Sequence, residues 1–162
     1  MSERSLSFTV NGETVTLRLS PRRHLGDVLR EELGLTGTHL GCEHGVCGAC
    51  TVRLDGEIVR ACLTLAVQCE GAAIETVEGL SDTGEVADLQ EAFRTRNALQ
   101  CGYCTPGMIV TAQDLLRRDP APSRDEIREH ISGNYCRCTG YHAIVDAIEA
   151  TAQARAAKGS AA

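Results

Sequence analysis

The order of apolar and polar residues changes character near residue 80. Before that point, apolar residues alternate with polar ones, as they do when one face of a β-strand is buried. Two such runs, 5–10 and 14–19, flank the pair Asn11-Gly12, which is typical of a tight hairpin turn. After residue 80, apolar residues recur at the spacing of amphipathic helices. The pattern therefore predicts a β-rich half followed by a helical half.

The β-rich half contains three further predicted elements: a short helix at 24–33, a second hairpin at 51–60 and a strand at 73–77. Gly34 would end the helix, and Asp55-Gly56 would form the turn of the hairpin. The segment 79–84, Gly-Leu-Ser-Asp-Thr-Gly, is interpreted as a linker.

The predicted helices of the second half are 86–98, a helix around 108–116, one beginning near 123 and a last one around 144–152, followed by a loose tail at 157–162. Thr105 and Pro106 are typical of a helix start, and Ser123 with Glu126 has the spacing of a capping box. Together the elements indicate an α+β fold with two units, 1–80 and 81–162. Each unit is near the lower size limit for an adequate core, so metal sites would help to stabilise it.

Composition and charge exclude further classes of function. The 162 residues include no Trp, two Phe and three Tyr, which leaves few large side chains for a core. A formal net charge of −6 at pH 7 argues against nucleic acid as a partner. No apolar run approaches about 18 residues, so no membrane-spanning helix is predicted. The distinctive feature is the set of nine cysteines.

The cysteines are expected to serve metal or redox chemistry. Residues 1–20 contain no apolar core of a signal peptide, and charged residues, not an apolar run, follow Arg22-Arg23. We therefore expect a cytoplasmic protein in a reducing compartment, where disulfides are rare. An odd number of cysteines agrees, because full pairing would leave one thiol over.

The first cysteine group has the plant-type [2Fe–2S] spacing C-x4-C-x2-C, with a fourth cysteine after eleven intervening residues. Its members are Cys42, Cys47, Cys50 and Cys62. Interspersed glycines would let the loop approach the cluster and aim backbone N–H groups at the sulfurs. The alternative is a structural zinc site, with His44 as a possible ligand. A Rieske centre is excluded, because a second histidine at the required spacing is missing.

The second group comprises Cys101 and Cys104 in C-x2-C spacing, then Cys136 and Cys138 in C-x-C spacing. Each pair precedes a predicted helix, whose free N–H groups favour an anion. A [2Fe–2S] cluster between helix ends would fit, and zinc remains the alternative. Cys69 belongs to neither group and is interpreted as a small buried residue.

Three segments carry a family resemblance: Gly41–Val52 (GCEHGVCGACTV), Gln100–Gly107 (QCGYCTPG) and Asn134–Tyr141 (NYCRCTGY). They resemble the iron–sulfur subunit of the molybdenum hydroxylase family, which includes xanthine dehydrogenase, aldehyde oxidoreductase and aerobic carbon monoxide dehydrogenase. The resemblance covers about residues 5–155, with every cluster ligand present. Cys69 is not among the family's ligands.

The resemblance implies a β-grasp ferredoxin-like domain followed by a four-helix domain, each with one [2Fe–2S] cluster. A large subunit would carry molybdopterin with molybdenum, and usually a medium subunit carries FAD. Cys138 would bind iron and also approach the pterin, which Gln100 would contact. Electrons would pass from molybdenum through the second cluster and then the first to FAD or another acceptor. No residue of this chain would perform substrate chemistry.

Two other functions remain open at this stage. A free-standing two-cluster electron carrier would be monomeric and diffusible, and a structural double-zinc protein would be colourless and redox-silent. Gln100 favours the hydroxylase subunit, since a lone carrier has no pterin to contact. The substrate, the terminal acceptor and the stoichiometry of a complex are not encoded in a recognisable pattern.

Overall fold

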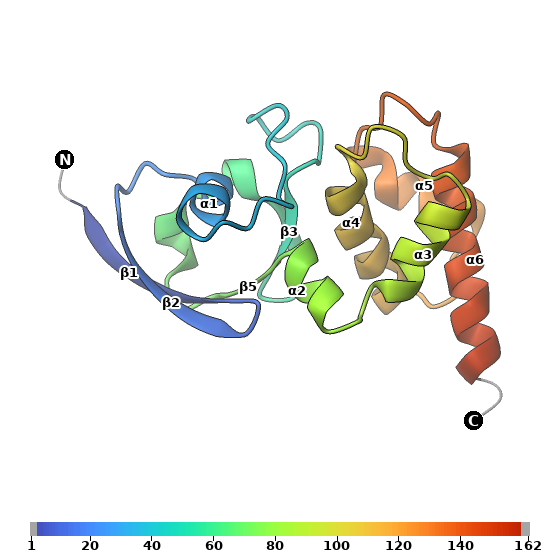
Figure 1. Ribbon diagram of the computed structural model, residues 1–162, viewed down its shortest axis with the longest axis horizontal. Helices are drawn as coiled ribbons and strands as arrows, with labels where there is room; N and C mark the ends of the chain where they lie inside the picture. Colours follow the sequence, from blue (N-terminus) through green and yellow to red (C-terminus); the bar gives the residue numbers. More distant parts are fainter. Residues whose placement is uncertain (1–2, 160–162) are drawn as a thin grey trace.

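A five-stranded mixed sheet forms the left half of the molecule in Figure 1. The computed structural model describes residues 3–159. The strands are β1 (Arg4–Val10), β2 (Glu13–Leu19), β3 (Thr51–Leu54), β4 (Glu57–Arg60) and β5 (Ala73–Glu75). Their order is β2-β1-β5-β3-β4, in which β1 and β5 are parallel and the other pairs antiparallel.

Both predicted hairpins are confirmed. The turn residues Asn11 and Gly12 have φ of 52° and 85°, and Asp55 and Gly56 have 49° and 86°. Two consecutive positive φ values give the turn a twist that matches the flanking strands. The alternation in β1 buries one face of the strand.

The predicted helix at 24–33 is divided into α1 (Leu25–Asp27) and a π-helical segment, η1 (Val28–Glu32). The His24 ring caps it by accepting the Asp27 N–H at 3.1 Å. The wider π turn is closed by the Leu33 N–H, which donates to the Val28 carbonyl five residues back. Leu25, Val28 and Leu29 are fully buried in the core under the sheet.

The interpretation of 79–84 as a linker is wrong. Residues 77–82 form helix α2 (Val77–Asp82), and Leu80 is buried at 1% exposure. The Asn11 side chain bonds both the backbone N–H and the hydroxyl of Thr76, which fixes the start of this helix beside the first hairpin. Gly and Ser in a short segment are poor helix formers, and this tertiary contact outweighs their preference.

The second half is helical, as predicted: α3 (Ala87–Thr95), α4 (Thr105–Arg118), α5 (Arg124–His130), a 3-10 turn η4 (Ile131–Gly133) and α6 (His142–Gly159). The Ser123–Glu126 capping box is present at α5. The N-cap of α4 is Cys104 instead of the predicted Thr105. Of the predicted loose tail, 157–159 belong to α6, and 160–162 lie outside the described residues.

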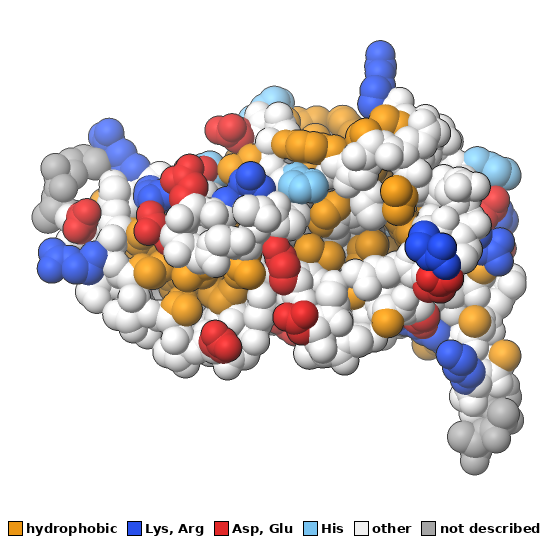
Figure 2. Space-filling model, in the orientation of Figure 1, with side chains coloured by type: hydrophobic (Ala, Val, Ile, Leu, Met, Phe, Trp, Pro, Cys, Tyr) orange, Lys and Arg blue, Asp and Glu red, His pale blue; other side chains and the backbone are white. Residues whose placement is uncertain are grey.

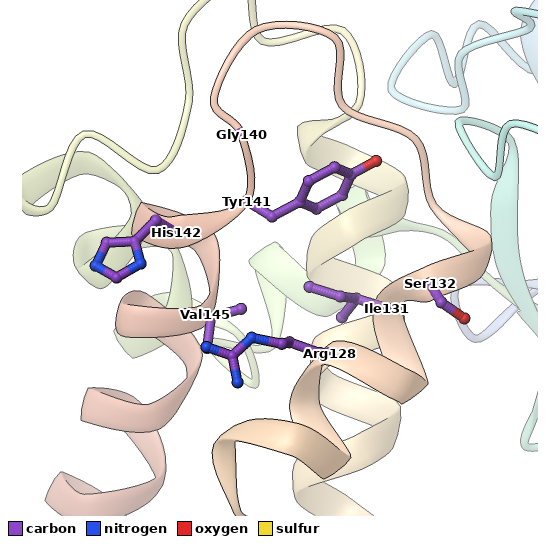
Figure 3. A pocket seen from close by; sticks show the side chains of 7 residues that line it. All are labelled: Arg128, Ile131, Ser132, Gly140, Tyr141, His142 and Val145. Atoms are coloured by element: carbon purple, nitrogen blue, oxygen red, sulfur yellow. The ribbon is translucent and has the colours of Figure 1, made fainter.

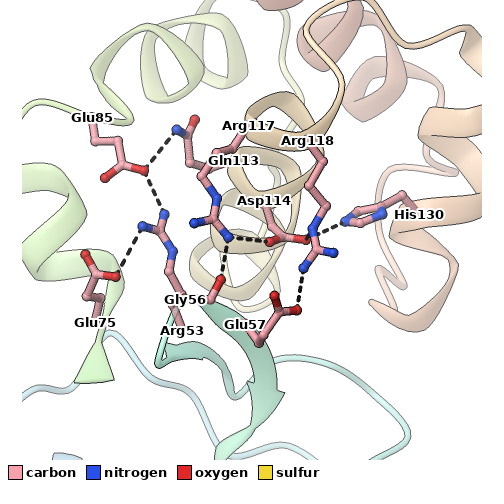
Figure 4. A network of polar contacts seen from close by, with 10 residues as sticks. All are labelled: Arg53, Gly56, Glu57, Glu75, Glu85, Gln113, Asp114, Arg117, Arg118 and His130. Carbon is pink, nitrogen blue, oxygen red and sulfur yellow. Dashed lines mark hydrogen bonds and ion pairs between the residues drawn. The ribbon is translucent and has the colours of Figure 1, made fainter. Parts of the chain in front are cut away.

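The two halves have separate apolar clusters, one under the sheet and one among the helices. Helix α4 packs against β3 at the boundary, and a polar network extends along it (Figure 4). Arg53, 4% exposed, donates to Glu75 at 3.2 Å and Glu85 at 2.7 Å. Buried Asp114 accepts from Arg117 and Arg118, which also reach the β3–β4 turn. No helix within residues 3–159 is long and apolar enough to cross a membrane.

Candidate metal centres

The first thiol group forms where one loop meets the second hairpin. Cys42 and Cys47 lie in the loop before β3, Cys50 directly precedes β3, and Cys62 follows β4 in a 3-10 turn. Antiparallel pairing of the two strands brings their outer ends together, and the Ala61 N–H donates to the Cys50 carbonyl at 3.1 Å. Cys50 and Cys62 are therefore buried, while Cys42 and Cys47 are half-buried.

Backbone N–H groups favour an anionic sulfur at Cys42. The Cys47 N–H donates to the Cys42 sulfur at 3.4 Å, and the amides of His44 and Val46 add to it, so the pKa of Cys42 is lowered to about 6. This agrees with the prediction that the loop aims N–H groups at sulfur. Burial, with a thiol contact to Cys50, instead raises the pKa of Cys62 to about 11.

The second thiol group lies between the starts of two helices. Cys101 and Cys104 precede α4, and Cys136 and Cys138 lie in the loop before α6. The Cys101 and Cys138 sulfurs are 3.5 Å apart and both residues are exposed. Burial and the neighbouring Cys136 thiol raise the pKa of Cys104 to about 12.

The surroundings of Cys136 favour the thiolate form of its side chain. Burial acts to raise its pKa, but the Thr139 hydroxyl, which donates to its sulfur at 3.1 Å, and nearby amides outweigh burial and lower it. The Cys136 N–H donates to the Tyr141 hydroxyl at 2.9 Å, which anchors the loop ahead of α6.

Both groups consist of two pairs of thiols. The pairs are Cys42 with Cys47, Cys50 with Cys62, Cys101 with Cys138 and Cys104 with Cys136. Among residues 3–159, no three Cys, His, Asp or Glu side chains converge as ligands of a single ion would. A [2Fe–2S] cluster takes four thiolates, two at each iron, so two pairs per group fit this cofactor.

One cavity of about 260 Å³ is lined by Cys42 and Cys47 of the first group and by all four cysteines of the second. Its lining consists of both loops and the start of α4: Gly41, Cys42, Cys47, Ala49, Cys101, Tyr103, Cys104, Tyr135, Cys136, Arg137 and Cys138. Their loops lie on the same side of the molecule, the upper side in Figure 1. Tertiary folding therefore brings together cysteines that are 54 to 96 positions apart in the chain.

The other residues that the sequence singled out are Gln100, His44 and Cys69. Gln100 is exposed beside Cys101. The ring of His44 contacts the Cys42 carbonyl instead of a thiol, so it does not act as a fourth ligand in this arrangement. Cys69 is fully buried in the sheet core, as interpreted, with its thiol 3.8 Å from the Leu65 carbonyl, and burial raises its pKa.

Sequence reasoning missed the residues that connect the two loops. Asn134 is 1% exposed and bonds Gly48 and Thr51 of the first half. His39 stacks on Tyr103 with ring centroids 4.7 Å apart, and its Nδ1 lies 2.7 Å from the Tyr103 carbonyl. Amide, hydroxyl and imidazole groups at scattered positions have no ligand spacing, so only the tertiary structure identifies them.

A second cavity is lined partly by the end of the second loop and has no thiol in its lining. It measures about 480 Å³ and is lined by Arg128, Ile131, Ser132, Gly140, Tyr141, His142 and Val145. In Figure 3, Ile131 and Val145 point toward each other across its floor. Because no cysteine lines this cavity, it belongs to neither thiol group.

Exposed large apolar side chains cluster near the cysteines. Within residues 3–159 they are Val46, Leu63, Leu65, Leu99, Tyr103 and Tyr135, each within three positions of a thiol-bearing residue. Figure 2 shows apolar side chains gathered in the upper middle of one face, between the two halves. Such a patch on a protein surface is typical of a protein–protein interface.

Comparison with known proteins assigns both halves. Residues 8–81 match a family described as a 2Fe-2S iron-sulfur cluster binding domain, and residues 76–149 match a [2Fe-2S] binding domain. The chain is 53% identical over 152 residues to caffeine dehydrogenase subunit gamma of Pseudomonas sp. (strain CBB1), covering 92% of this chain and 91% of that one. It is 54% identical over 143 residues to the nicotine 6-hydroxylase small subunit of Paenarthrobacter nicotinovorans, covering 88% and 86%.

Solved structures give the same result. Quinoline 2-oxidoreductase from Pseudomonas putida 86 matches with a TM-score of 0.91 and 56% identity over 98% of both chains. Aldehyde oxidoreductase from Desulfovibrio gigas matches with a TM-score of 0.88 and 43% identity over 96% of this chain but 17% of that longer one. With two [2Fe–2S]-binding domains in this order, the chain belongs to the iron–sulfur subunits of the molybdenum hydroxylase family.

Proposed function

We propose that this chain transfers electrons within a molybdenum hydroxylase through two [2Fe–2S] clusters held by its eight grouped cysteines. The first cluster would be bound by Cys42, Cys47, Cys50 and Cys62, and the second by Cys101, Cys104, Cys136 and Cys138. Each cluster, when bound, accepts and releases one electron at a time. The observation that carries the proposal is the arrangement of each group as two pairs of neighbouring thiols, four thiols to a group.

The chain's own residues would tune the two sites. The amides around Cys42 and the hydroxyl of Thr139 at Cys136 stabilise negative sulfur, and hydrogen bonds to sulfur raise a cluster's potential. The buried pair Cys50 and Cys62 excludes water from one side of the first site. Glu43 directly follows the ligand Cys42, but it is an exposed loop residue. No side chain of this subunit is assigned to proton transfer.

The second site is proposed to face the molybdopterin of a large subunit. Cys101 and Cys138 are exposed at the surface, and Gln100 is exposed beside them. An exposed ligand and an adjacent carboxamide are suited to approach a cofactor held by another chain. Cys138 would bind iron and contact the pterin, and Gln100 would bond the same cofactor.

A hetero-oligomer follows from this arrangement. Exposed apolar residues beside the thiols, such as Val46, Leu63 and Leu99, would be covered by partners. The partners would be the molybdopterin subunit and a subunit that carries FAD, the acceptor side lying next to the first cluster. Of the four relatives named above, three are named for caffeine, nicotine and quinoline and one for aldehydes, and the three are the more similar in sequence, at 53–56% against 43% identity. A nitrogen heterocycle is therefore the proposed substrate class of the assembled enzyme.

We further propose two domains, 1–80 with a β-grasp ferredoxin-like fold and 81–162 with a four-helix fold. The two halves have separate apolar clusters, which supports a division in two; Leu80 of α2 packs in the helical cluster, so α2 goes with the helical unit. A cytoplasmic location is proposed because thiols that bind iron must stay reduced, and none of the nine cysteines forms a disulfide.

Metal analysis with EPR spectroscopy tests the proposal. The purified chain should contain about four irons and four acid-labile sulfides, and dithionite should produce two distinct rhombic signals. The large subunit should co-purify with it. About two zincs and no signal would instead leave a structural module. Two signals with a stable monomer that binds no partner would indicate a free-standing carrier.

A further inference from the structure

A threonine directly follows a proposed ligand cysteine three times in this chain. The dipeptides are Cys50-Thr51, Cys104-Thr105 and Cys138-Thr139. Two of the three hydroxyls have partners within the chain: Thr51 donates to the Gly48 carbonyl at 2.6 Å, and Thr139 donates to the Cys136 sulfur at 3.1 Å. The hydroxyl of Thr105 is the one that the proposed function does not yet use.

The Thr105 hydroxyl is buried and has no hydrogen-bond partner among residues 3–159. Within the same residues, the Nε of Arg53 and the Nε2 of His130 share that state, but both of these side chains have charged partners nearby. Thr105 differs, because the hydroxyl is the only polar group of its side chain. A buried hydroxyl without an acceptor loses its hydration without compensation. Its acceptor is therefore expected to come from outside the chain.

The position of Thr105 limits which acceptor this is. Thr105 is the first residue of α4, a helix of 14 residues, and Cys104 is its N-cap. The residue also lines a mainly apolar cavity with Val77, Gln90, Phe93, Leu99, Gly102, Pro106 and Ile109. The other polar side chain in that lining, Gln90, donates to the Ser81 hydroxyl at 2.7 Å and does not bond Thr105. The second thiol group includes the preceding residue, and the start of a helix favours an anion, so that group offers the suitable acceptor.

We infer that the Thr105 hydroxyl donates a hydrogen bond to anionic sulfur of the second cluster, a ligand thiolate or a bridging sulfide, and raises the reduction potential of that cluster. The inference rests on the proposed function. A hydrogen bond to sulfur stabilises the reduced form more than the oxidised form, because the reduced form carries more negative charge. With Thr139 at Cys136, the second cluster would receive one hydroxyl from each of the two segments that supply its ligands.

Two substitutions at Thr105 separate the hydroxyl from the shape of the side chain. Thr105→Val replaces the hydroxyl with a methyl group of similar size, and Thr105→Ser keeps the hydroxyl while removing the methyl group. Thr151→Val is the matched control. Thr151 is also buried, its hydroxyl donates to the Ala147 carbonyl at 2.9 Å, and it lines a cavity without a cysteine. All variants are studied in the assembled enzyme.

The readouts are the reduction potentials of both clusters, from EPR-monitored redox titration, and the hyperfine couplings of exchangeable protons at the second cluster, from ENDOR before and after exchange into D₂O. In Thr105→Val, the equilibrium constant for reducing the second cluster should fall by about tenfold, which is about 59 mV for a one-electron couple. One exchangeable coupling should disappear, and the potential of the first cluster should not change. Thr105→Ser and Thr151→Val should behave as the parent in both measurements.

A parent-like potential and a full set of couplings in Thr105→Val would overturn the inference, because the hydroxyl would then be bonded to water and not to sulfur. A potential shift that Thr105→Ser shows as well would also overturn it, since the shape of the side chain would be responsible. If Thr105→Val does not assemble, Thr105→Ala removes the same hydroxyl with a good helix former and is compared with Thr105→Ser in the same way. A parent enzyme without two cluster signals would instead refute the proposed function.

Discussion

At the residue scale, Gly48 is constrained twice. Its φ of +73° lies in the left-handed region, where a side chain is strained, and the second loop packs directly on its α-carbon. The first constraint could be anticipated from its place between two ligands of a tight loop. The second depends on a segment more than 80 positions away.

We expect Gly48→Ala to be far more damaging than Gly12→Ala. Gly12 also has a positive φ, of +85°, but a Cβ there would meet nothing within 4 Å, so its replacement should cost about 1–2 kcal/mol. Gly48→Ala should cost at least about 2 kcal/mol more, because backbone must move. Urea unfolding and iron content measure this; equal costs would mean that the loops are not in close contact.

At the element scale, charged side chains fix the last helix. Arg155 of α6 donates twice to Asp88 of α3, both at 2.8 Å, and to Gln113 of α4 at 2.9 Å. One guanidinium therefore ties three helices together. The hydrogen bond from Arg155 is the main cause that lowers the pKa of Asp88 below 3.8.

Arg155→Ala should lower the free energy of unfolding at pH 7 by about 1 kcal/mol, a value discounted for the partial exposure of the pair. Since the pKa of Asp88 is lowered in the folded state, its stabilisation is complete above the unfolded value of 3.8 and is lost as the pH falls through the folded value. The difference in the free energy of unfolding between the parent protein and Arg155→Ala should therefore become smaller at acidic pH. Urea unfolding at several pH values provides the test.

Arg94→Ala is the matched control. Arg94 pairs with Glu91 on the same helix, and both side chains are largely exposed. Exposed pairs often contribute nothing measurable, so no change is expected for this variant. A pH-independent loss with Arg155→Ala would show that its packing, and not the ion pair, stabilises the helices.

At the scale of the whole molecule, the two thiol groups come from different halves, and Cys42 and Cys47 line one cavity with the second group. The first group depends on the loop and hairpin beside the sheet, and the second on the starts of α4 and α6. Each site should therefore be removable without the other, although their loops are in contact.

Cys138→Ser should abolish the second EPR signal and about half of the iron, and retain the first signal. Electron flow from molybdenum should stop with it. Cys69→Ser is the control, because this buried thiol belongs to the sheet core and should leave both clusters intact. Normal turnover in the Cys138 variant, or loss of a cluster in the Cys69 variant, would contradict these roles.

Much of the local structure was predictable because it depends on short-range physics. The turn pairs Asn11-Gly12 and Asp55-Gly56 accept the positive φ values of tight hairpins, and Ser123 caps its own helix. The π turn in η1 and the helix at 77–82 were missed. For the helix, the contact between Asn11 and Thr76 outweighs local preference, and nothing in the structure explains the π turn.

The sequence by itself determined the two thiol groups, because residue identity and spacing are local properties of a chain. Spacing left zinc open beside [2Fe–2S], and the family resemblance favoured the cluster. The sequence also determined the division into a β-rich and a helical half. Only the tertiary structure decided how the halves meet: Asn134 against Gly48, Tyr135 against Cys47 and α4 against β3. Those contacts join residues far apart in the chain through hydrogen bonds and close packing, and neither leaves a periodic pattern in the sequence.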